Sequence, residues 1–169
     1  MARVFWPIVL GAVLISAGAV HAARGDAPVA ATVIAVVSGT EIDVVITESA
    51  IEDTLAAHTI ARVVYHGIVS PGRFDPLYME AFDLNWNLVS DSKVFLQPAS
   101  VLWDEEERLH AYVFLDPSGY GMVNAFLLAS GLASIDPGFV GDDPYTAFLT
   151  GIAAIAKRAS LGVWREATE

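Results

Sequence analysis

The chain has no cysteine and few basic residues. Without thiolates it has no disulfides, no lipid-modified N-terminal cysteine and neither a zinc finger nor an iron–sulfur centre. Lysine and arginine number 9 against 20 aspartates and glutamates, which gives a formal net charge of −11. Nucleic-acid-binding proteins usually gather basic residues on one face, so this balance disfavours a nucleic-acid partner. It is typical of a protein whose copies repel one another, and we expect a monomer with a possible protein partner.

The one long apolar run lies at the N-terminus. Arg3 precedes the uncharged residues 4–20, and the small residues Ala22 and Ala23 follow. A basic start, an apolar middle and small residues at the end are the layout of a secretory signal peptide. We therefore predict a signal peptide over residues 1–22, a linker over 23–29 and one domain over 30–165, exported to the periplasm or the extracellular space and not held at a membrane. The alternative, a retained anchor, stays open, although the run is shorter than the roughly 20 residues of a typical membrane span.

Alternating and β-branched residues predict five strands. Two of them flank Ser-Gly-Thr as a hairpin, and the last two are separated by an acidic turn, Asp104–Glu107. The predicted strands are Ala31–Val37, Ile42–Ile46, His58–Tyr65, Lys93–Gln97 and Arg108–Leu115.

Three helices are predicted as well. Asp75-Pro76 and Asp143-Pro144 each combine an N-cap residue with a proline at the first helical position, and a third helix runs from Gly121 to Ser130. A helix after the third strand and two closing helices give an α+β protein, mainly β: a five-stranded barrel of the oligonucleotide/oligosaccharide-binding (OB) type with three helices.

Four short segments, in this order, resemble the staphylococcal nuclease-like (thermonuclease) family. They are similar to the start of its first helix, its Arg-x-x-Ala-Tyr-Val strand, its Val-Asn helix ending in Gly-Leu-Ala, and its closing Leu-Gly-x-Trp: Pro76–Ala81, Arg108–Val113, Tyr120–Ala133 and Leu161–Trp164. The likeness covers roughly residues 30–165. The lead-in to the second segment departs from the family, because Asp104–Glu107 replaces Asp-x-Tyr-Gly. An unrelated small barrel is the alternative.

The resemblance implies metal-assisted phosphodiester hydrolysis, with two acidic ligands for Ca²⁺, a glutamate base and two arginines. This sequence departs from that pattern at four of the five positions. Thr40 and Val69 stand where the metal-binding acids belong, Gly72 where the glutamate belongs and Val64 where the first arginine belongs. Only Arg108 matches a catalytic residue of the family. We expect Thr40, Val69, Gly72 and Arg108 to converge near Val64.

Neighbouring charged residues offer an alternative site. Glu41 and Asp43 flank the first turn, and Arg62 lies two residues before the expected arginine. Because side chains alternate along a strand, Glu41 is predicted to point away from the ligand position, and Arg62 to lie on the correct face but displaced by about 7 Å. A nuclease with a rearranged site, holding Ca²⁺ or another divalent cation, therefore stays open, while the main expectation is no metal and no cofactor.

The remaining histidines and tryptophans have plain structural interpretations. His58, His66 and His110 are scattered without metal-ligand spacing and are expected at strand or loop surfaces, and Glu105–Glu107 reads as a solvated turn. Three tryptophans are expected to pack at helix and strand ends: Trp86, Trp103 and Trp164. The sequence thus predicts an exported thermonuclease-like domain that is catalytically inactive and acts as a binding or interaction module; the alternative is the metal-dependent nuclease of DNA or RNA with a rearranged site.

Overall fold

The computed structural model describes residues 28–48, 55–139 and 143–165. The predicted signal peptide and nearly all of the predicted linker lie outside these residues. The first strand begins at Val29, one residue before the predicted start of the domain. Within these ranges, no helix combines the length and the apolar character needed to span a bilayer.

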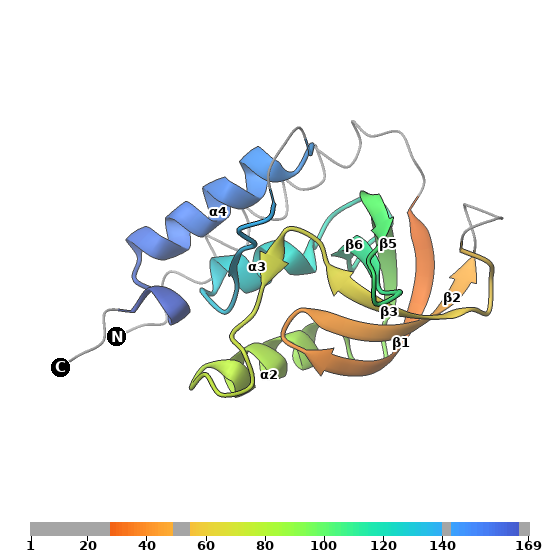
Figure 1. The fold of residues 1–169 in the computed structure, drawn as a ribbon, viewed down its shortest axis with the longest axis horizontal. Coiled ribbons are helices and arrows are strands. Elements are labelled where there is room, and N and C mark those ends of the chain that lie inside the picture. The colour runs from red at the N-terminus through yellow and green to blue at the C-terminus, as the bar shows by residue number, and fades with distance from the viewer. Residues whose placement is uncertain (1–27, 49–54, 140–142, 166–169) are drawn as a thin grey trace.

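Five strands close into a barrel in the order β1-β2-β3-β6-β5 (Figure 1). Their bounds are β1 Val29–Ser38, β2 Glu41–Glu48, β3 Ile60–Tyr65, β5 Lys93–Trp103 and β6 Leu109–Phe114. Four pairings are antiparallel, and β3 and β6 pair in parallel, with Val64 opposite His110. This confirms the predicted fold class: an α+β protein, mainly β, with an OB-like five-stranded barrel.

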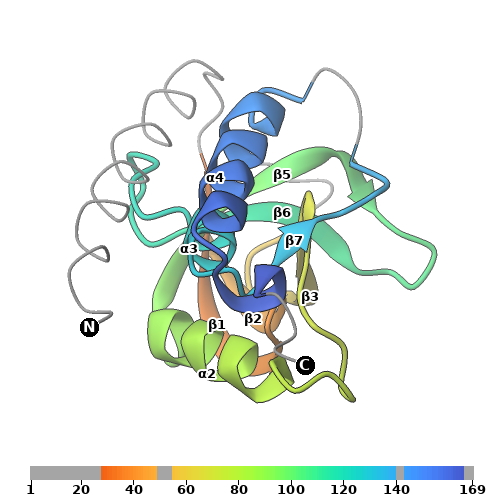
Figure 2. The same cartoon turned by 90° about the vertical axis from the view of Figure 1, so that its left-hand side faces the viewer.

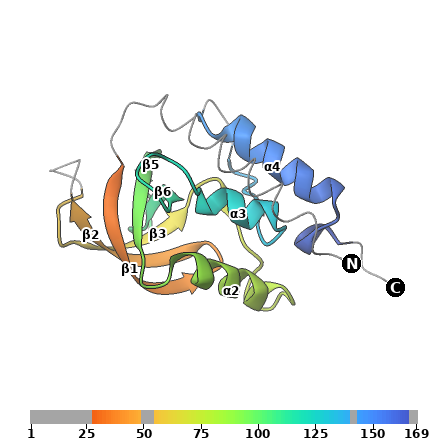
Figure 3. The ribbon, with the colours of Figure 1, turned by 180° about the vertical axis from the view of Figure 1, so that it is seen from behind.

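Three α-helices among the described residues flank the barrel: α2 Tyr78–Val89, α3 Val123–Ala129 and α4 Thr146–Arg158. Helix α2 packs against β1, whereas α3 contacts both β6 and α4, so that α3 lies between the barrel and α4 (Figures 1 and 3). Residues Val123 to Leu128 of α3 are all buried. Seen from the side, α4 runs across α3, and a short 3₁₀ helix, Gly162–Trp164, follows it (Figure 2).

Both Asp-Pro helix starts were predicted two residues too early. The carboxylate of Asp75 accepts a hydrogen bond from the Leu77 amide at 2.8 Å, and α2 begins at Tyr78. The carboxylate of Asp143 accepts one from the Tyr145 amide at 2.9 Å, and α4 begins at Thr146. In each case the aspartate carbonyl also accepts from the amide three residues on, at 3.0 Å, so a hydrogen-bonded turn precedes the helix.

A second, two-stranded sheet was not predicted. Strand β4, Ile68–Val69, pairs with β7, Ser134–Ile135. The Asp136 amide also donates to the Gly67 carbonyl at 3.1 Å. This small sheet ties the segment after β3 to the segment between α3 and α4, and it thereby fixes the direction in which the chain leaves the barrel.

Candidate functional site

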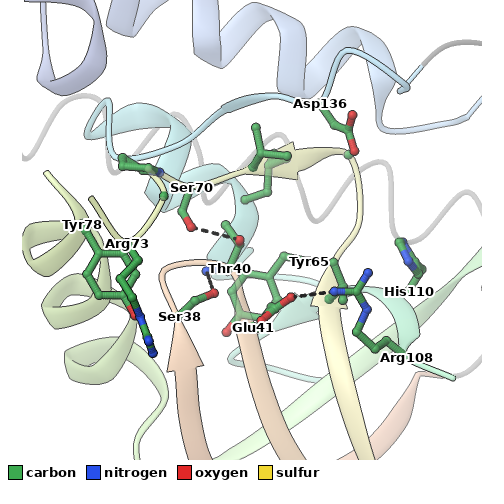
Figure 4. A pocket seen from close by; sticks show the side chains of 16 residues that line it. Ser38, Thr40, Glu41, Tyr65, Ser70, Arg73, Tyr78, Arg108, His110 and Asp136 are labelled. Atoms are coloured by element: carbon green, nitrogen blue, oxygen red, sulfur yellow. Dashed lines mark hydrogen bonds and ion pairs between the residues drawn. The ribbon is translucent and has the colours of Figure 1, made fainter. Parts of the chain in front are cut away.

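A pocket of about 410 Å³ opens where the β1–β2 turn, the β3–β4 segment and the loop before α2 meet (Figure 4). Thr40, Val64, Val69, Gly72 and Arg108 all line this pocket. The predicted convergence of these residues is therefore confirmed. The other lining residues are Ser38, Glu41, Tyr65, Gly67, Ile68, Ser70, Pro71, Arg73, Tyr78, His110 and Asp136.

Hydroxyl groups occupy the base of the pocket, where the resemblance would place carboxylates. Thr40 is only 7% exposed, and its hydroxyl pairs with the Ser70 hydroxyl at 3.2 Å. The Thr40 amide donates to the Ser38 hydroxyl, also at 3.2 Å. These groups are uncharged, so they offer a metal ion none of the negative charge that calcium sites use.

The β3–β4 segment carries none of the acidic side chains that the resemblance calls for. Val69 is 39% exposed, and its side chain has no atom that can donate or accept a hydrogen bond. Gly72 is exposed, and a Cβ added there would have no heavy atom within 4 Å, so a side chain would fit. The absence of a base at this position is therefore a property of the residue and not of the space around it.

A buried asparagine holds two walls of the pocket together. The Tyr65 hydroxyl donates to the Asn85 side-chain oxygen at 2.8 Å, and the Asn85 nitrogen donates to the Ser38 carbonyl at 2.8 Å. Burial raises the pKa of Tyr65, and the hydrogen bond to Asn85 opposes this only in part. Tyr65 therefore stays neutral and donates this bond at physiological pH.

Asn124, in α3, makes a similar clamp between β6 and the residue that follows β3. Its side-chain oxygen accepts from the Val113 amide at 3.0 Å, and its nitrogen donates to the His66 carbonyl at 3.0 Å. Asn85 and Asn124 are both fully buried. The oxygen and the nitrogen of each side-chain amide have a hydrogen-bond partner inside the protein. The two clamps fix α2 and α3 to the barrel at the pocket end.

Arg108, the one match to a catalytic residue, is surrounded by carboxylates. Its Nε donates to Asp104 at 2.8 Å, and one terminal nitrogen lies 3.1 Å from Glu41 and 3.2 Å from Glu106. Burial lowers the pKa of Arg108, but the hydrogen bond and charge of Asp104, with the charges of Glu106 and Glu41, raise it above its ordinary value. The guanidinium stays charged, and that charge is already compensated.

Asp104 is the centre of this network. It accepts hydrogen bonds from the Arg108 amide, the Glu106 amide and the Arg108 side chain, and it lies 3.1 Å from His110 Nε2. Partial burial raises the pKa of Asp104, but these hydrogen bonds together hold it well below its ordinary value. The acidic turn therefore does more than face solvent: its first residue orients Arg108.

The prediction that Glu41 points away from the pocket is wrong. Thr40 belongs to the turn and not to β2, so strand alternation does not relate its side chain to that of Glu41. Glu41 is the first residue of β2 and lies opposite Val64, on the outer face of the barrel, where it reaches Arg108.

Arg62 and Asp43 pair with each other outside the pocket. Arg62 donates two hydrogen bonds to the Asp43 carboxylate, at 2.8 and 3.0 Å, and neither residue lines the pocket. Among the residues that the structure describes, no group of three or more histidines, aspartates and glutamates is arranged to hold a metal ion.

Two of the three histidines among the described residues lie together. The rings of His66 and His110 are 5.8 Å apart, because the parallel pairing of β3 and β6 brings the ends of these strands side by side. His66 also lies 4.0 Å from the Asp143 carboxylate. His58 is exposed, as expected, and has a positive φ of 68°.

Trp103 ends β5 and Trp164 ends the 3₁₀ helix, as expected, whereas Trp86 lies inside α2. Trp86 stacks on Phe82 with ring centroids 6.1 Å apart, and Lys157 lies over the Trp164 ring at 5.2 Å. Trp86 is 48% exposed and Trp103 is 37% exposed. None of the three lines the pocket.

In comparisons with known proteins, no protein-family model and no curated protein matches this chain.

Proposed function

We propose that this chain is an exported thermonuclease-like protein without nuclease activity, which acts as a binding or interaction module. The observation that carries the proposal is the pocket itself. At the positions where the resemblance calls for two metal ligands and a base, it presents the Thr40 hydroxyl, the Val69 side chain and the bare backbone of Gly72.

The state of Arg108 supports the same conclusion. A catalytic arginine must face the phosphate as negative charge develops on it. Here Asp104, Glu41 and Glu106 contact the guanidinium at 2.8 to 3.2 Å. A polyanion would have to displace these carboxylates in a protein of net charge −11, so we expect weak binding at physiological salt.

A second candidate, a metal-dependent nuclease with a rearranged site, is favoured by one specific observation. The carboxylates of Glu41 and Asp136 both line the pocket, although Glu41 is engaged by Arg108. Two carboxylates in one pocket are the minimum from which a divalent cation site could be assembled. The two candidates differ in whether any divalent cation supports cleavage.

The test is a cleavage assay of single- and double-stranded DNA and RNA with Ca²⁺, Mg²⁺, Mn²⁺ and Zn²⁺ at neutral pH. We expect no cleavage above background with any of the four ions. An Arg108→Ala variant prepared in parallel identifies contamination, because a contaminating nuclease would persist in it. Metal-dependent cleavage by the wild type that is lost in Arg108→Ala and in Glu41→Gln would establish the second candidate instead.

Export is part of the proposal and has its own test. The basic start, the apolar run and the small residues near Ala22 support removal of residues 1–22. We expect the protein recovered from its producing cell to begin at Ala23, as measured by intact mass. A full-length chain recovered in the membrane fraction would show that the segment is a retained anchor.

A further inference from the structure

The lining of the pocket is balanced in charge. It contains two carboxylates, Glu41 and Asp136, and two guanidiniums, Arg73 and Arg108. Arg108 contacts three carboxylates, so it presents little uncompensated positive charge to a ligand. An anionic ligand would meet Glu41 and Asp136 at the same pocket. The charges therefore favour a ligand with no net charge.

The hydroxyl groups at the base are arranged for exchange with a ligand. The Thr40–Ser70 distance of 3.2 Å is longer than the usual separation of about 2.7–2.8 Å for hydroxyl hydrogen bonds. Each hydroxyl both donates and accepts, so a ligand hydroxyl can replace this weak bond with two stronger ones. The pocket base thus matches a molecule that carries hydroxyls of its own.

The walls of the pocket add hydrogen-bond acceptors, a hydrogen-bond donor and an aromatic ring. In Figure 4, Thr40 and Ser70 point toward each other, with Asp136 on one side of them and Tyr78 and Arg73 on the α2 side. One oxygen of Asp136 accepts from the Gly138 amide at 2.8 Å, which fixes the carboxylate in place. Phe74, in the same loop as Arg73, is 99% exposed. Phe74 is not among the lining residues, so it is the Tyr78 ring that offers a flat apolar surface beside the polar groups.

We propose that the pocket binds a neutral oligosaccharide. A sugar ring has hydroxyls around its edge, which suit Thr40, Ser70 and the fixed carboxylate of Asp136, and an apolar face of C–H groups, which suits Tyr78. The volume of about 410 Å³ lies in the range of about 300–1,000 Å³ typical of small-molecule sites. This inference rests on the proposed function, because a nuclease would use the same pocket for a phosphate.

The experiment uses the purified 169-residue chain on an array of neutral and sulfated glycans, followed by NMR titration of the neutral glycan that binds best. We expect neutral glycans to bind and to shift resonances of pocket residues. The double variant Thr40→Val/Ser70→Ala removes the hydroxyls and keeps the shape, and it should weaken binding about tenfold. Tyr78→Ala should weaken it similarly. Tyr120→Ala, at a 48% exposed aromatic residue outside the pocket, is the matched control and should leave binding unchanged.

Several outcomes would overturn the inference. These are no binding of any neutral glycan, a preference for sulfated glycans, or glycan binding that the Thr40/Ser70 variant does not reduce. The cleavage assay on the same sample separates this inference from the proposed function. Glycan binding together with metal-dependent cleavage would contradict the proposed function alone, whereas no cleavage and no glycan binding would contradict the inference alone.

Discussion

Two sets of residues differ at the pocket end of the barrel: the asparagines that hold its walls, and the lining residues Thr40, Ser70, Val69 and Gly72. The first set is buried and fully engaged, as Asn85 and Asn124 show with hydrogen bonds of 2.8 to 3.0 Å on both sides of each amide. The second set is loosely engaged through its side chains: Thr40 and Ser70 share one bond of 3.2 Å, and Val69 and Gly72 have no polar side chain. Arg108 also lines the pocket, but three carboxylates hold it at 2.8 to 3.2 Å.

The difference teaches which residues can change without loss of the fold. Replacing a wall residue leaves a buried donor or acceptor unpaired, which is costly. Replacing Val69 or Gly72, which have no polar side chain, changes mainly what solvent or a ligand meets. A barrel can therefore keep its geometry while its chemistry is exchanged, and the function must be argued from the lining.

The largest loss of stability is expected at Gly162, where the backbones of two segments lie closest to each other. Gly162 has a φ of +51°, and a Cβ there would overlap the carbonyl group of Gly131. We expect Gly162→Ala to lower the free energy of unfolding by about 4 kcal/mol, since the backbone itself must move. Urea unfolding measures this. Gly151→Ala is the matched control: Gly151 is exposed in α4 with no atom near its Cβ position, so it should gain about 1 kcal/mol.

Removal of a wall clamp should cost slightly less. Asn85→Leu leaves the Tyr65 hydroxyl and the Ser38 carbonyl without their partner, and we expect a loss of about 3 kcal/mol in the free energy of unfolding. Asn87→Leu, at an exposed position of the same helix, should change it by less than about 0.5 kcal/mol. Equal losses in both variants would show that Asn85 is not a clamp.

The network around Arg108 predicts a pH dependence. The folded-state pKa of Asp104 lies below its unfolded value, so its stabilisation is present above about pH 4 and is lost as the pH falls toward the folded-state pKa. Asp104→Asn should cost about 2 kcal/mol at pH 7, because it removes charged hydrogen bonds. Chemical denaturation at pH 7 and pH 3 should show this difference shrinking at low pH; a constant difference would contradict the linkage.

The smallest effect is expected at the surface ion pair. Arg62 and Asp43 have side chains 46% and 25% exposed, and such pairs contribute about 0.2–1 kcal/mol. We expect Arg62→Gln to lower the free energy of unfolding by about 0.5 kcal/mol and to leave the pocket unchanged in NMR spectra. A loss above about 2 kcal/mol in the free energy of unfolding would show that Arg62 helps to hold the fold together.

The sequence predicted the barrel because its strands carry a local signal. In β2, Ile42, Val44 and Ile46 are buried and alternate with partly exposed residues. The strands were predicted from stretches rich in β-forming residues that end at turn residues. The convergence of Thr40, Val69 and Arg108 followed from the motif resemblance, since no local pattern relates residues so far apart in the chain. The pocket positions were therefore predictable, while their surroundings were not.

What the sequence could not predict depends on contacts between distant segments. The two-residue strands β4 and β7 are too short to show a period. The pairing of His66 with His110 follows from the parallel register of β3 and β6, which leaves no mark on either strand alone. The orientation of Glu41 depends on where the turn ends, a boundary of one residue that strand alternation cannot locate.

A titration with calcium, monitored by calorimetry and by NMR, tests the proposed function most directly, because the proposal is that this pocket lacks the metal chemistry of a nuclease. The wild type should show no heat of binding and no shift of pocket resonances, because Thr40 and Val69 supply no negative charge. The Thr40→Asp/Val69→Asp variant should bind Ca²⁺ with shifts confined to the pocket. Calcium binding to the wild-type pocket that Glu41→Gln abolishes would contradict the account.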